Sequence, residues 1–351
     1  MVKDEINAWL VGFVAHVNAP ALEHTEVRRV HQPPGEAVFQ VESGAGAYTA
    51  DQVVVASGGY HVPIIPRFAE RLPADVQQVH SADYRLPAQL PDGDVLVVGS
   101  GQSGARIAED PHLAGRQVHL AVGDAPCCAR FYRGKDVVDW LANMGHYDMP
   151  VTAQPLREGV RDNTNHYVTG RDGGRDIDLR QFAREGMQLY SVLEGYETRA
   201  LQFRPNLRQC LGTADKIYNG ISASIDRYIA DKGIAAPAGT PYAPVWEPAE
   251  ERASLDLAAS DIRTVLWCIG FMPGFGFVDA PVFNNRGQPQ RQCGITQVRG
   301  LYFLGLPWLH TWGSGRFSGI ARDALHLAEA IRARHDSDCD MAAHQPIAQT
   351  S

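Results

Sequence analysis

The chain has 351 residues, of which 44% are hydrophobic, 21% charged and 9% aromatic. This composition is that of an ordinary folded protein of about two domains, and it excludes disordered, collagenous and membrane-spanning classes. The net charge of -8 disfavours nucleic acid as a partner, because the average surface repels a polyanion.

The first 56 residues predict a helix followed by a β-meander. Apolar residues spaced three and four apart predict a helix over 4–17, whose apolar face needs a partner. Short β-type runs predict strands at 26–30, 37–41 and 52–56. The segment Ser43 to Ala47 predicts a hairpin turn, and the run Val53 to Ala56 predicts a parallel strand that is buried on both faces.

The middle of the chain predicts a strand, helix, strand unit. After a proline-rich link at 63–91, an apolar strand at 95–98 runs directly into the sequence GSGQSG. A helical stretch follows this turn, and the next strand is expected at 118–122. This order and length are typical of a βαβ crossover, so the sequence predicts an α/β fold.

The remaining elements are read from periodicity and composition. Helical spacing continues at 177–190 and 217–230, and a loop rich in Pro and Ala follows at 235–248. Buried strands are expected at 264–269 and 301–304, and a last helix at 319–334. Residues 336–351 have little apolar content and predict a disordered tail.

The glycine turn carries the strongest functional signal. Gly99 permits the tight turn, Gly101 lets the backbone approach a pyrophosphate, and Gly104 lets helix and strand pack closely. The pyrophosphate would face free N–H groups at the positive end of the helix dipole. The predicted dinucleotide site consists of Gly99, Ser100, Gly101, Gln102, Ser103 and Gly104.

The choice of dinucleotide rests on charges that follow the second strand. Asp124 lies 20 residues after Gly104, where an acid can bind a ribose 2′-hydroxyl, and this favours NAD. The cations Arg130, Arg133 and Lys135 suit a 2′-phosphate instead, although a solvated surface loop also explains them. We predict NADP(H) and keep NAD as the alternative.

The six cysteines are irregularly spaced and include no Cys-x-x-Cys pair. They predict neither a disulfide framework nor a metal site, and a reducing cytoplasm fits them best. The adjacent Cys127 and Cys128 are expected to pack rather than to form a redox pair. The N-terminus lacks the layout of a signal peptide, and no run of about 18 apolar residues predicts a membrane span.

Several motifs resemble those of flavin-containing and Baeyer-Villiger monooxygenases. The segment ASGGYHVPIIP at 56–66 is similar to their A-T-G-x-x-x-x-P-x-x-P stretch. His80 to Arg85 resembles the second half of their fingerprint, whereas Ala74 and Val76 replace the Phe and Gly of its first half. The segment 268–271 resembles their second A-T-G strand end, and GLYFLGL with the helix after it resembles their closing flavin-domain strand and helix.

This resemblance implies two Rossmann-like domains. An NAD(P)-binding domain at 91–258 would be inserted in a FAD-binding domain formed by 1–90 and 259–335. The residues implied in flavin binding are Ala56, Ser57, Gly58, Gly270 and Gly305. The family's first G-x-G-x-x-G has no counterpart before position 95, so we expect Met1 to be an internal start or the product of a truncation that weakens FAD binding and impairs activity.

The resemblance also implies an activity. Members of this family reduce FAD with NADPH, capture O2 as a C4a-(hydro)peroxyflavin and transfer one oxygen atom to a small organic substrate. Nitrogen, sulfur and carbonyl centres all stay open as acceptors, as does a homodimer, and no membrane partner is expected. The alternative is a degenerate NADP(H)-binding module without catalytic flavin, and a disulfide reductase ranks behind it because Cys-x-x-Cys is absent.

No residue is singled out as catalytic. His80 could shape the cofactor cleft, but a structural role is preferred. The segment GSGRFSG at 313–319 could offer N–H groups to an anion or a flavin edge, or it could be a plain loop.

Overall fold

A computed structural model describes residues 3–123, 125–155 and 166–343. The chain divides into two compact units. Unit 1 comprises Met1–His61, Tyr147–Arg161 and Pro273–Ser351, and unit 2 comprises Val62–His146 and Asp162–Met272. These boundaries differ from the expected ones near residues 90 and 258, because strands at 77–80 and 262–267 both pair within the sheet of unit 2.

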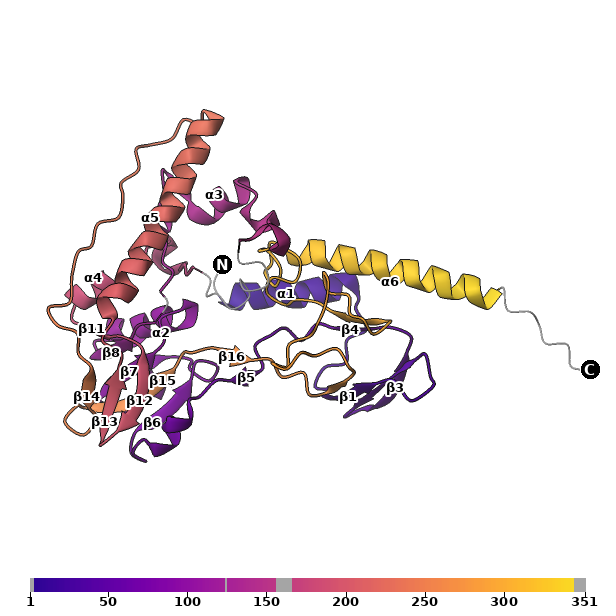
Figure 1. The fold of residues 1–351 in the computed structure, drawn as a ribbon, viewed down its shortest axis with the longest axis horizontal. Coiled ribbons are helices and arrows are strands. Elements are labelled where there is room, and N and C mark those ends of the chain that lie inside the picture. Colours follow the sequence, from indigo (N-terminus) through magenta and orange to yellow (C-terminus); the bar gives the residue numbers. More distant parts are fainter. Residues whose placement is uncertain (1–2, 124, 156–165, 344–351) are drawn as a thin grey trace, which may run out of the picture. The chain divides into compact units, whose positions relative to one another are not determined.

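Unit 2 is built on a five-stranded sheet in the order β11-β8-β7-β15-β6 (Figure 1). Its strands are β6 (Gln77–His80), β7 (Asp94–Val98), β8 (Val118–Ala121), β11 (Gln188–Tyr190) and β15 (Ile262–Trp267). All four pairings are parallel. The predicted α/β class is therefore confirmed for this unit.

Both faces of this sheet are covered, which is the usual state of a parallel sheet. Val95 and Val97 pack with Ala105 and Ala108 of α2 in one core cluster, which also includes residues of α4 and α5. The alternate residue Leu96 lies in a second cluster with residues of a small antiparallel sheet. The elements concerned are α2 (Gln102–Leu113), α4 (Leu179–Arg184), α5 (Leu207–Lys232), β12 (Leu193–Glu197), β13 (Ala200–Phe203) and β14 (Ser254–Asp256).

Unit 2 also contains shorter elements. They are β5 (Val62–Pro63), which pairs with β16 (Phe271–Met272), β9 (Phe131–Tyr132), which pairs with β10 (Lys135–Asp136), and α3 (Val137–Asn143). The 3-10 helices of the described chain are η1 (Arg67–Arg71), η2 (Pro87–Gln89), η3 (His146–Asp148), η4 (Val151–Ala153) and η6 (Arg171–Gly173).

Unit 1 holds a four-stranded sheet in the order β17-β1-β2-β3 and a parallel pair, β18-β4. The strands are β1 (Val27–His31), β2 (Phe39–Ser43), β3 (Gly46–Ala50), β4 (Val53–Val55), β17 (Val278–Asp279) and β18 (Leu301–Phe303). Ser43 pairs with Gly46, so the predicted hairpin is confirmed. Val54 is 39% exposed, so the prediction that β4 is buried on both faces is wrong. Its sheet has only two strands in the described chain.

The α-helices of unit 1 in the described residues are α1 (Lys3–Val17) and α6 (Ile320–Ala343). The predicted N-terminal helix is confirmed, but its large apolar side chains stay at the surface, and Trp9 is 53% exposed. Trp9 stacks on Phe13, with ring centroids 5.6 Å apart, and meets the edge of Phe317 at 6.2 Å. No helix in the described residues is both long enough and apolar enough to cross a membrane.

Three predicted helix boundaries are wrong. The helix expected over 217–230 is part of α5, which begins ten residues earlier, at Leu207. The helical stretch expected over 177–190 ends at Arg184, because Gly186 takes φ +110° and the chain then enters β11. The last helix continues to Ala343, into the segment expected to be a disordered tail. Residues 335–343 contain no Gly or Pro to stop it, and residues 344–351 lie outside the described chain.

A buried histidine in β8 makes the stability of unit 2 depend on pH. His119 Nε2 lies 3.1 Å from Asp94 Oδ2, and burial lowers the pKa of the ring despite this carboxylate. The unfolded chain therefore binds a proton at a higher pH than the folded chain does. We expect the contribution of His119 to be complete above about pH 6.5 and to be lost as pH falls toward the lowered folded value.

Urea unfolding at several pH values measures this effect. Below about pH 6.5 the free energy of unfolding of the wild-type chain should carry a His119 component of up to about 1.4 kcal/mol per pH unit, and His119→Gln, whose amide can still bond to Asp94, should lack it. Identical pH dependence in the two proteins would contradict this prediction.

Candidate functional site

The glycine turn lies where the strand order of the unit 2 sheet reverses. On one side β7 pairs with β8, the next strand of the sheet along the chain, to which α2 connects it. On the other side β7 pairs with β15, which comes much later in the chain. In open α/β sheets, the crevice outside the carboxyl ends of strands at such a switch point is where ligands bind. The predicted G-x-G-x-x-G therefore stands at the expected place in the sheet.

Two glycines of the turn are required by close backbone contacts. Gly99 has φ +102°, and a Cβ there would lie 2.6 Å from the carbonyl oxygen of Cys268 at the end of β15. A Cβ on Gly104 would overlap the carbonyl oxygen of Gly99. Gly101 differs, because its φ of -73° and ψ of -167° suit any residue. The backbone conformation therefore does not require Gly at position 101.

The helix end itself presents donors. Gly101 is the N-cap of α2, and the first hydrogen bond within the helix runs from Ala105 N to Gly101 O, at 3.0 Å. The N–H groups of Gln102 and Ser103 belong to the first turn, where helices leave N–H groups without intrahelical partners. Ser100 is 1% exposed, and its Oγ accepts from Gly123 N at 3.0 Å, so this hydroxyl ties the turn to the end of β8.

A later segment of the chain is held against α2, and sequence reasoning missed it. The side-chain amide of Gln102 donates to Val168 O at 3.2 Å and accepts from Val168 N at 3.3 Å. Glu109, which is 1% exposed, pairs with Arg171 at 3.0 Å and with Arg175 at 2.5 Å. Burial raises the pKa of Glu109, and the two arginines oppose that rise. A Glu eight residues after the N-cap, on the face of the helix that packs on the sheet, is the signal in the sequence that could have indicated these buried ion pairs.

The predicted 2′-phosphate cations all have partners. Arg130 pairs with Asp136 at 2.5 Å, and Arg133 Nη1 lies 2.8 Å from Asp226 Oδ1. The Lys135 ammonium lies over the Trp140 ring, 5.0 Å from its centroid. A phosphate bound here would compete with two carboxylates for the guanidinium groups. Asp124, the residue that favours NAD, lies outside the described residues.

Unit 1 brings together the two strand ends that were predicted to contact flavin. Val55 of β4 pairs with Phe303 of β18, and Leu304 N donates to Val55 O at 2.9 Å. Ala56, Ser57 and Gly58 therefore leave the pair beside Leu304 and Gly305. Gly58 and Gly305 have φ of +79° and +80°, and no atom lies within 4 Å of a Cβ at either position. The two strand ends thus share an open backbone surface.

The predicted loop 313–319 closes on this surface. A Cβ on Gly319 would overlap the backbone of Gly313, and one on Gly315 would lie 3.2 Å from Gly305 O. This packing directs the chain into α6, whose first turn contains Asp323, 2% exposed. Burial raises the pKa of Asp323, and a hydrogen bond to Ser314 opposes the rise.

Gly270, the remaining residue predicted to bind flavin, lies in unit 2. Its carbonyl oxygen accepts from Ile64 N at 3.1 Å and lies 3.1 Å from His80 Nε2. His80 Nδ1 accepts from Ala82 N at 3.1 Å, so the ring hydrogen is on Nε2. His80 is 3% exposed and fully engaged in joining β6 to the end of β15, as its preferred structural role requires.

The adjacent cysteines are free thiols. Burial raises the pKa of both Cys127 and Cys128 to about 12. A thiol reacts as the thiolate, so neither group is activated for redox or nucleophilic chemistry. In the described residues, no group of three or more His, Cys, Asp or Glu side chains is placed to hold a metal ion.

Comparison with known proteins places this geometry among flavoproteins. Residues 2–161 match the family described as pyridine nucleotide-disulphide oxidoreductase. An uncharacterised CzcO-like oxidoreductase of Geobacillus kaustophilus is 29% identical over 334 residues, which are 94% of this chain and 78% of that protein. The flavin-containing monooxygenase FMO GS-OX2 of Arabidopsis thaliana is 29% identical over 122 residues, which are 33% of this chain and 27% of that protein.

A solved structure extends the likeness to the whole fold. The flavin-containing monooxygenase of Stenotrophomonas maltophilia superposes with a TM-score of 0.61 at 18% identity, covering 95% of this chain and 77% of that one. The resemblance predicted from the motifs is confirmed: the chain is an oxidoreductase similar to the flavin-containing monooxygenases.

Proposed function

We propose that this chain is a flavin-dependent, NAD(P)H-using monooxygenase that transfers one oxygen atom from O2 to a small organic substrate. The flavin-containing monooxygenases that it resembles use FAD and NADPH. The observation that supports the proposal is the β7–α2 turn, in which contacts require two glycines and the third, Gly101, is the N-cap of α2 in an ordinary backbone conformation.

The nucleotide would bind to unit 2. Its pyrophosphate would lie against Gly101 and the first-turn N–H groups of Gln102 and Ser103, where the helix dipole favours an anion. The adenosine ribose would lie beyond the end of β8. Arg130 and Arg133 stand on the chain that follows that strand, and they support NADPH provided that the phosphate displaces Asp136 and Asp226.

The flavin would bind to unit 1, along the shared ends of β4 and β18. Ala56, Ser57, Gly58 and Gly305 provide the open backbone there, and loop 313–319 borders it. In this assignment unit 1 corresponds to the FAD-binding domain and unit 2 to the NAD(P)-binding domain inserted in it. Gly270 would serve as a positioning residue, because its carbonyl is held by His80 and Ile64.

When bound, the two cofactors supply hydride transfer and the activation of O2. The chain's own contribution is to hold and orient them and to exclude water. The ion pairs of the buried Glu109 with Arg171 and Arg175 fix the segment that covers α2. This would keep the nucleotide end of the site ordered. The free thiols and His80 take no part in this chemistry.

A pair of glycine variants separates nucleotide binding from folding. Gly101→Val places a branched side chain where the pyrophosphate would approach, in an ordinary backbone conformation, so we expect loss of NADPH binding. Because valine is a poorer N-cap than glycine, the free energy of unfolding should fall by about 1 kcal/mol at most. Gly104→Ala forces a Cβ onto the Gly99 carbonyl and should lower the free energy of unfolding by about 3 kcal/mol. Calorimetric titration and urea unfolding measure the two effects, and unchanged NADPH affinity in Gly101→Val would place the nucleotide elsewhere.

Charge variants test the 2′-phosphate site. The double variant Arg130→Ala, Arg133→Ala should weaken NADPH by about tenfold or more and NADH much less. Conversely, Asp136→Asn keeps a residue that can cap α3 but releases Arg130, and it should strengthen NADPH binding. Equal effects of the arginine substitutions on NADH and NADPH would refute this role.

Absorbance spectroscopy tests the function as a whole. Protein supplied with FAD should become yellow, lose the flavin absorbance when NADPH is added without oxygen, and consume O2 in air. Gly101→Val should still take up FAD but should not be reduced by NADPH. Protein that binds NADPH, seen as a raised unfolding midpoint, but takes up no FAD would instead be a nucleotide-binding module.

A further inference from the structure

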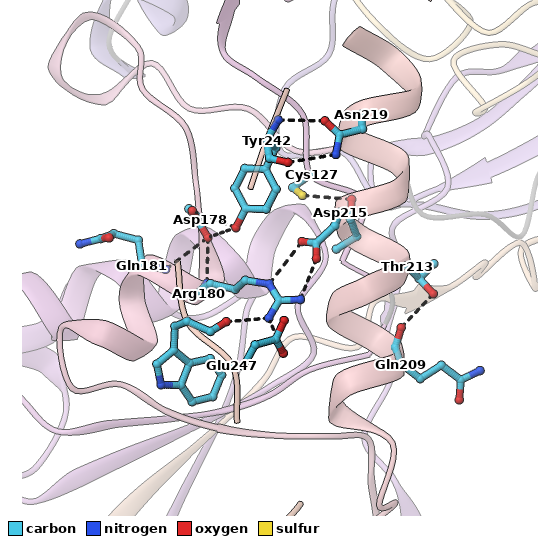
Figure 2. A network of polar contacts seen from close by, with 12 residues as sticks. Cys127, Asp178, Arg180, Gln181, Gln209, Thr213, Asp215, Asn219, Tyr242 and Glu247 are labelled. Atoms are coloured by element: carbon cyan, nitrogen blue, oxygen red, sulfur yellow. Dashed lines mark hydrogen bonds and ion pairs between the residues drawn. The ribbon is translucent and has the colours of Figure 1, made fainter. Parts of the chain in front are cut away.

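Unit 2 contains a small cavity beside α4 and α5, none of whose lining residues is assigned above to a cofactor, although Asp176 in the lining accepts from Arg130 N at 2.6 Å. Its volume is about 20 Å³, which is room for one group of the size of water. Its polar lining consists of Tyr167, Asp176, Asp178, Asp215, Tyr218 and Tyr242, together with Cys127 and Arg180. Figure 2 shows part of this lining, with Tyr242 directed at Asp178 and Arg180 at Asp215.

Two phenols and the guanidinium in this lining already use donors within the protein. Tyr242 donates its only hydroxyl hydrogen to Asp178, at 3.1 Å, and Tyr218 donates to Asp176 at 2.8 Å. Arg180 Nη2 donates to Asp215 at 2.7 Å, and its Nη1 donates to Trp246 O, also at 2.7 Å. The two phenol oxygens can therefore only accept further hydrogen bonds. A ligand that contacts these two oxygens must donate to them, whereas the Tyr167 hydroxyl can either donate or accept.

The cavity is also negatively charged. Three carboxylates and one guanidinium line it, and that guanidinium is shared with Glu247 at 3.0 Å. The pKa of Tyr218 is raised first by burial and then by Asp176. The pKa of Cys127 is raised to about 12 by burial, with Asp215 and Asp178 adding to the rise. Burial is the largest cause of both shifts, and the carboxylates add to them. The negative charge of these carboxylates would repel an anion and attract a cation.

One buried hydroxyl in the lining has no partner. Tyr167 is 2% exposed, and its Oη makes no hydrogen bond to any described group. The groups that raise its pKa after burial include Cys127, Asp178 and Tyr242, so the hydroxyl faces the same cavity. Buried polar groups are nearly always hydrogen-bonded, and the missing partner is expected inside the cavity.

We propose that this cavity binds a primary ammonium group, either free ammonium or the head of a small amine. Its N–H groups would donate to the oxygens of Tyr167, Tyr218 and Tyr242, and Asp176 and Asp178 would balance its charge. A water molecule would satisfy Tyr167 but would leave that charge unbalanced. A multivalent metal is not expected, because in the described chain these carboxylates do not form a metal-binding group.

Thermal unfolding of the whole chain tests the proposal without FAD or NADPH, so its outcome is independent of the proposed function. Ammonium or methylammonium chloride should raise the midpoint saturably at constant ionic strength. Tetramethylammonium is larger and has no N–H group, so it should not raise the midpoint. A response to ammonium alone would identify the free ion, and a stronger response to methylammonium would identify an amine head group.

Single substitutions test whether ammonium binds in this cavity. Tyr167→Phe keeps the buried ring and removes the hydroxyl, and it should weaken ammonium binding by about fivefold or more. Asp176→Asn should weaken it as well, by removing charge. Tyr228→Phe, on the same helix as Tyr218, is the matched control, because its hydroxyl bonds to Asn143 O at 3.1 Å outside the cavity lining.

Three outcomes would overturn the proposal: equal midpoint shifts with ammonium and tetramethylammonium, no saturable shift with any of the cations, or wild-type affinity in folded Tyr167→Phe. If Tyr167→Phe does not fold, the ammonium affinities of Asp176→Asn and Tyr218→Phe test the proposal instead. Wild-type affinity in both of these would overturn the proposal.

Discussion

The arrangement of unit 2 depends on how closely three backbone segments meet at one point. The turn after β7 touches the carbonyl of Cys268 at the end of β15, and the first turn of α2 touches the carbonyl of Gly99. Neither contact leaves room for a Cβ. These contacts bring the start of α2 to the reversal point of the strand order, so its N–H groups face the crevice rather than the core. Packing therefore requires glycine at positions 99 and 104, and the proposed function gives a different reason for glycine at position 101.

The parts of the fold that could be predicted are those with a local cause. The alternation of Val95, Leu96 and Val97 in a short apolar run is sufficient to predict a strand covered on both faces, and the glycines after it predict the turn. The prediction failed at β4, where the same kind of run includes Val54, 39% exposed. Composition cannot reveal how many strands stand beside a given one, because strand pairing is set by distant parts of the chain.

Helix ends and site partners were harder to predict for the same reason. The apolar periodicity predicted one helix over 177–190, but the positive φ of Gly186 ends the helix before that residue. The basic residues Arg130 and Arg133 were read as free cations, but their carboxylate partners stand at Asp136 and Asp226. Asp226 lies far along the sequence on α5, and only the fold brings it to Arg133. Spacing alone could not have indicated that pairing.

These ion pairs affect how well the chain could distinguish NADPH from NADH. Breaking a partly buried ion pair costs free energy. A 2′-phosphate that displaces a carboxylate must therefore make interactions with the arginine that are at least as favourable. Arg133 and Asp226 are 23% and 41% exposed, so water weakens their attraction and a doubly charged phosphate can compete. The 4% exposed Arg180, held by Asp215 and Glu247, is more strongly committed. The two arginines of unit 2 therefore differ: in the proposed function a 2′-phosphate would displace the partner of the half-buried Arg133, whereas Arg180 beside α5 is a fixed part of the cavity wall.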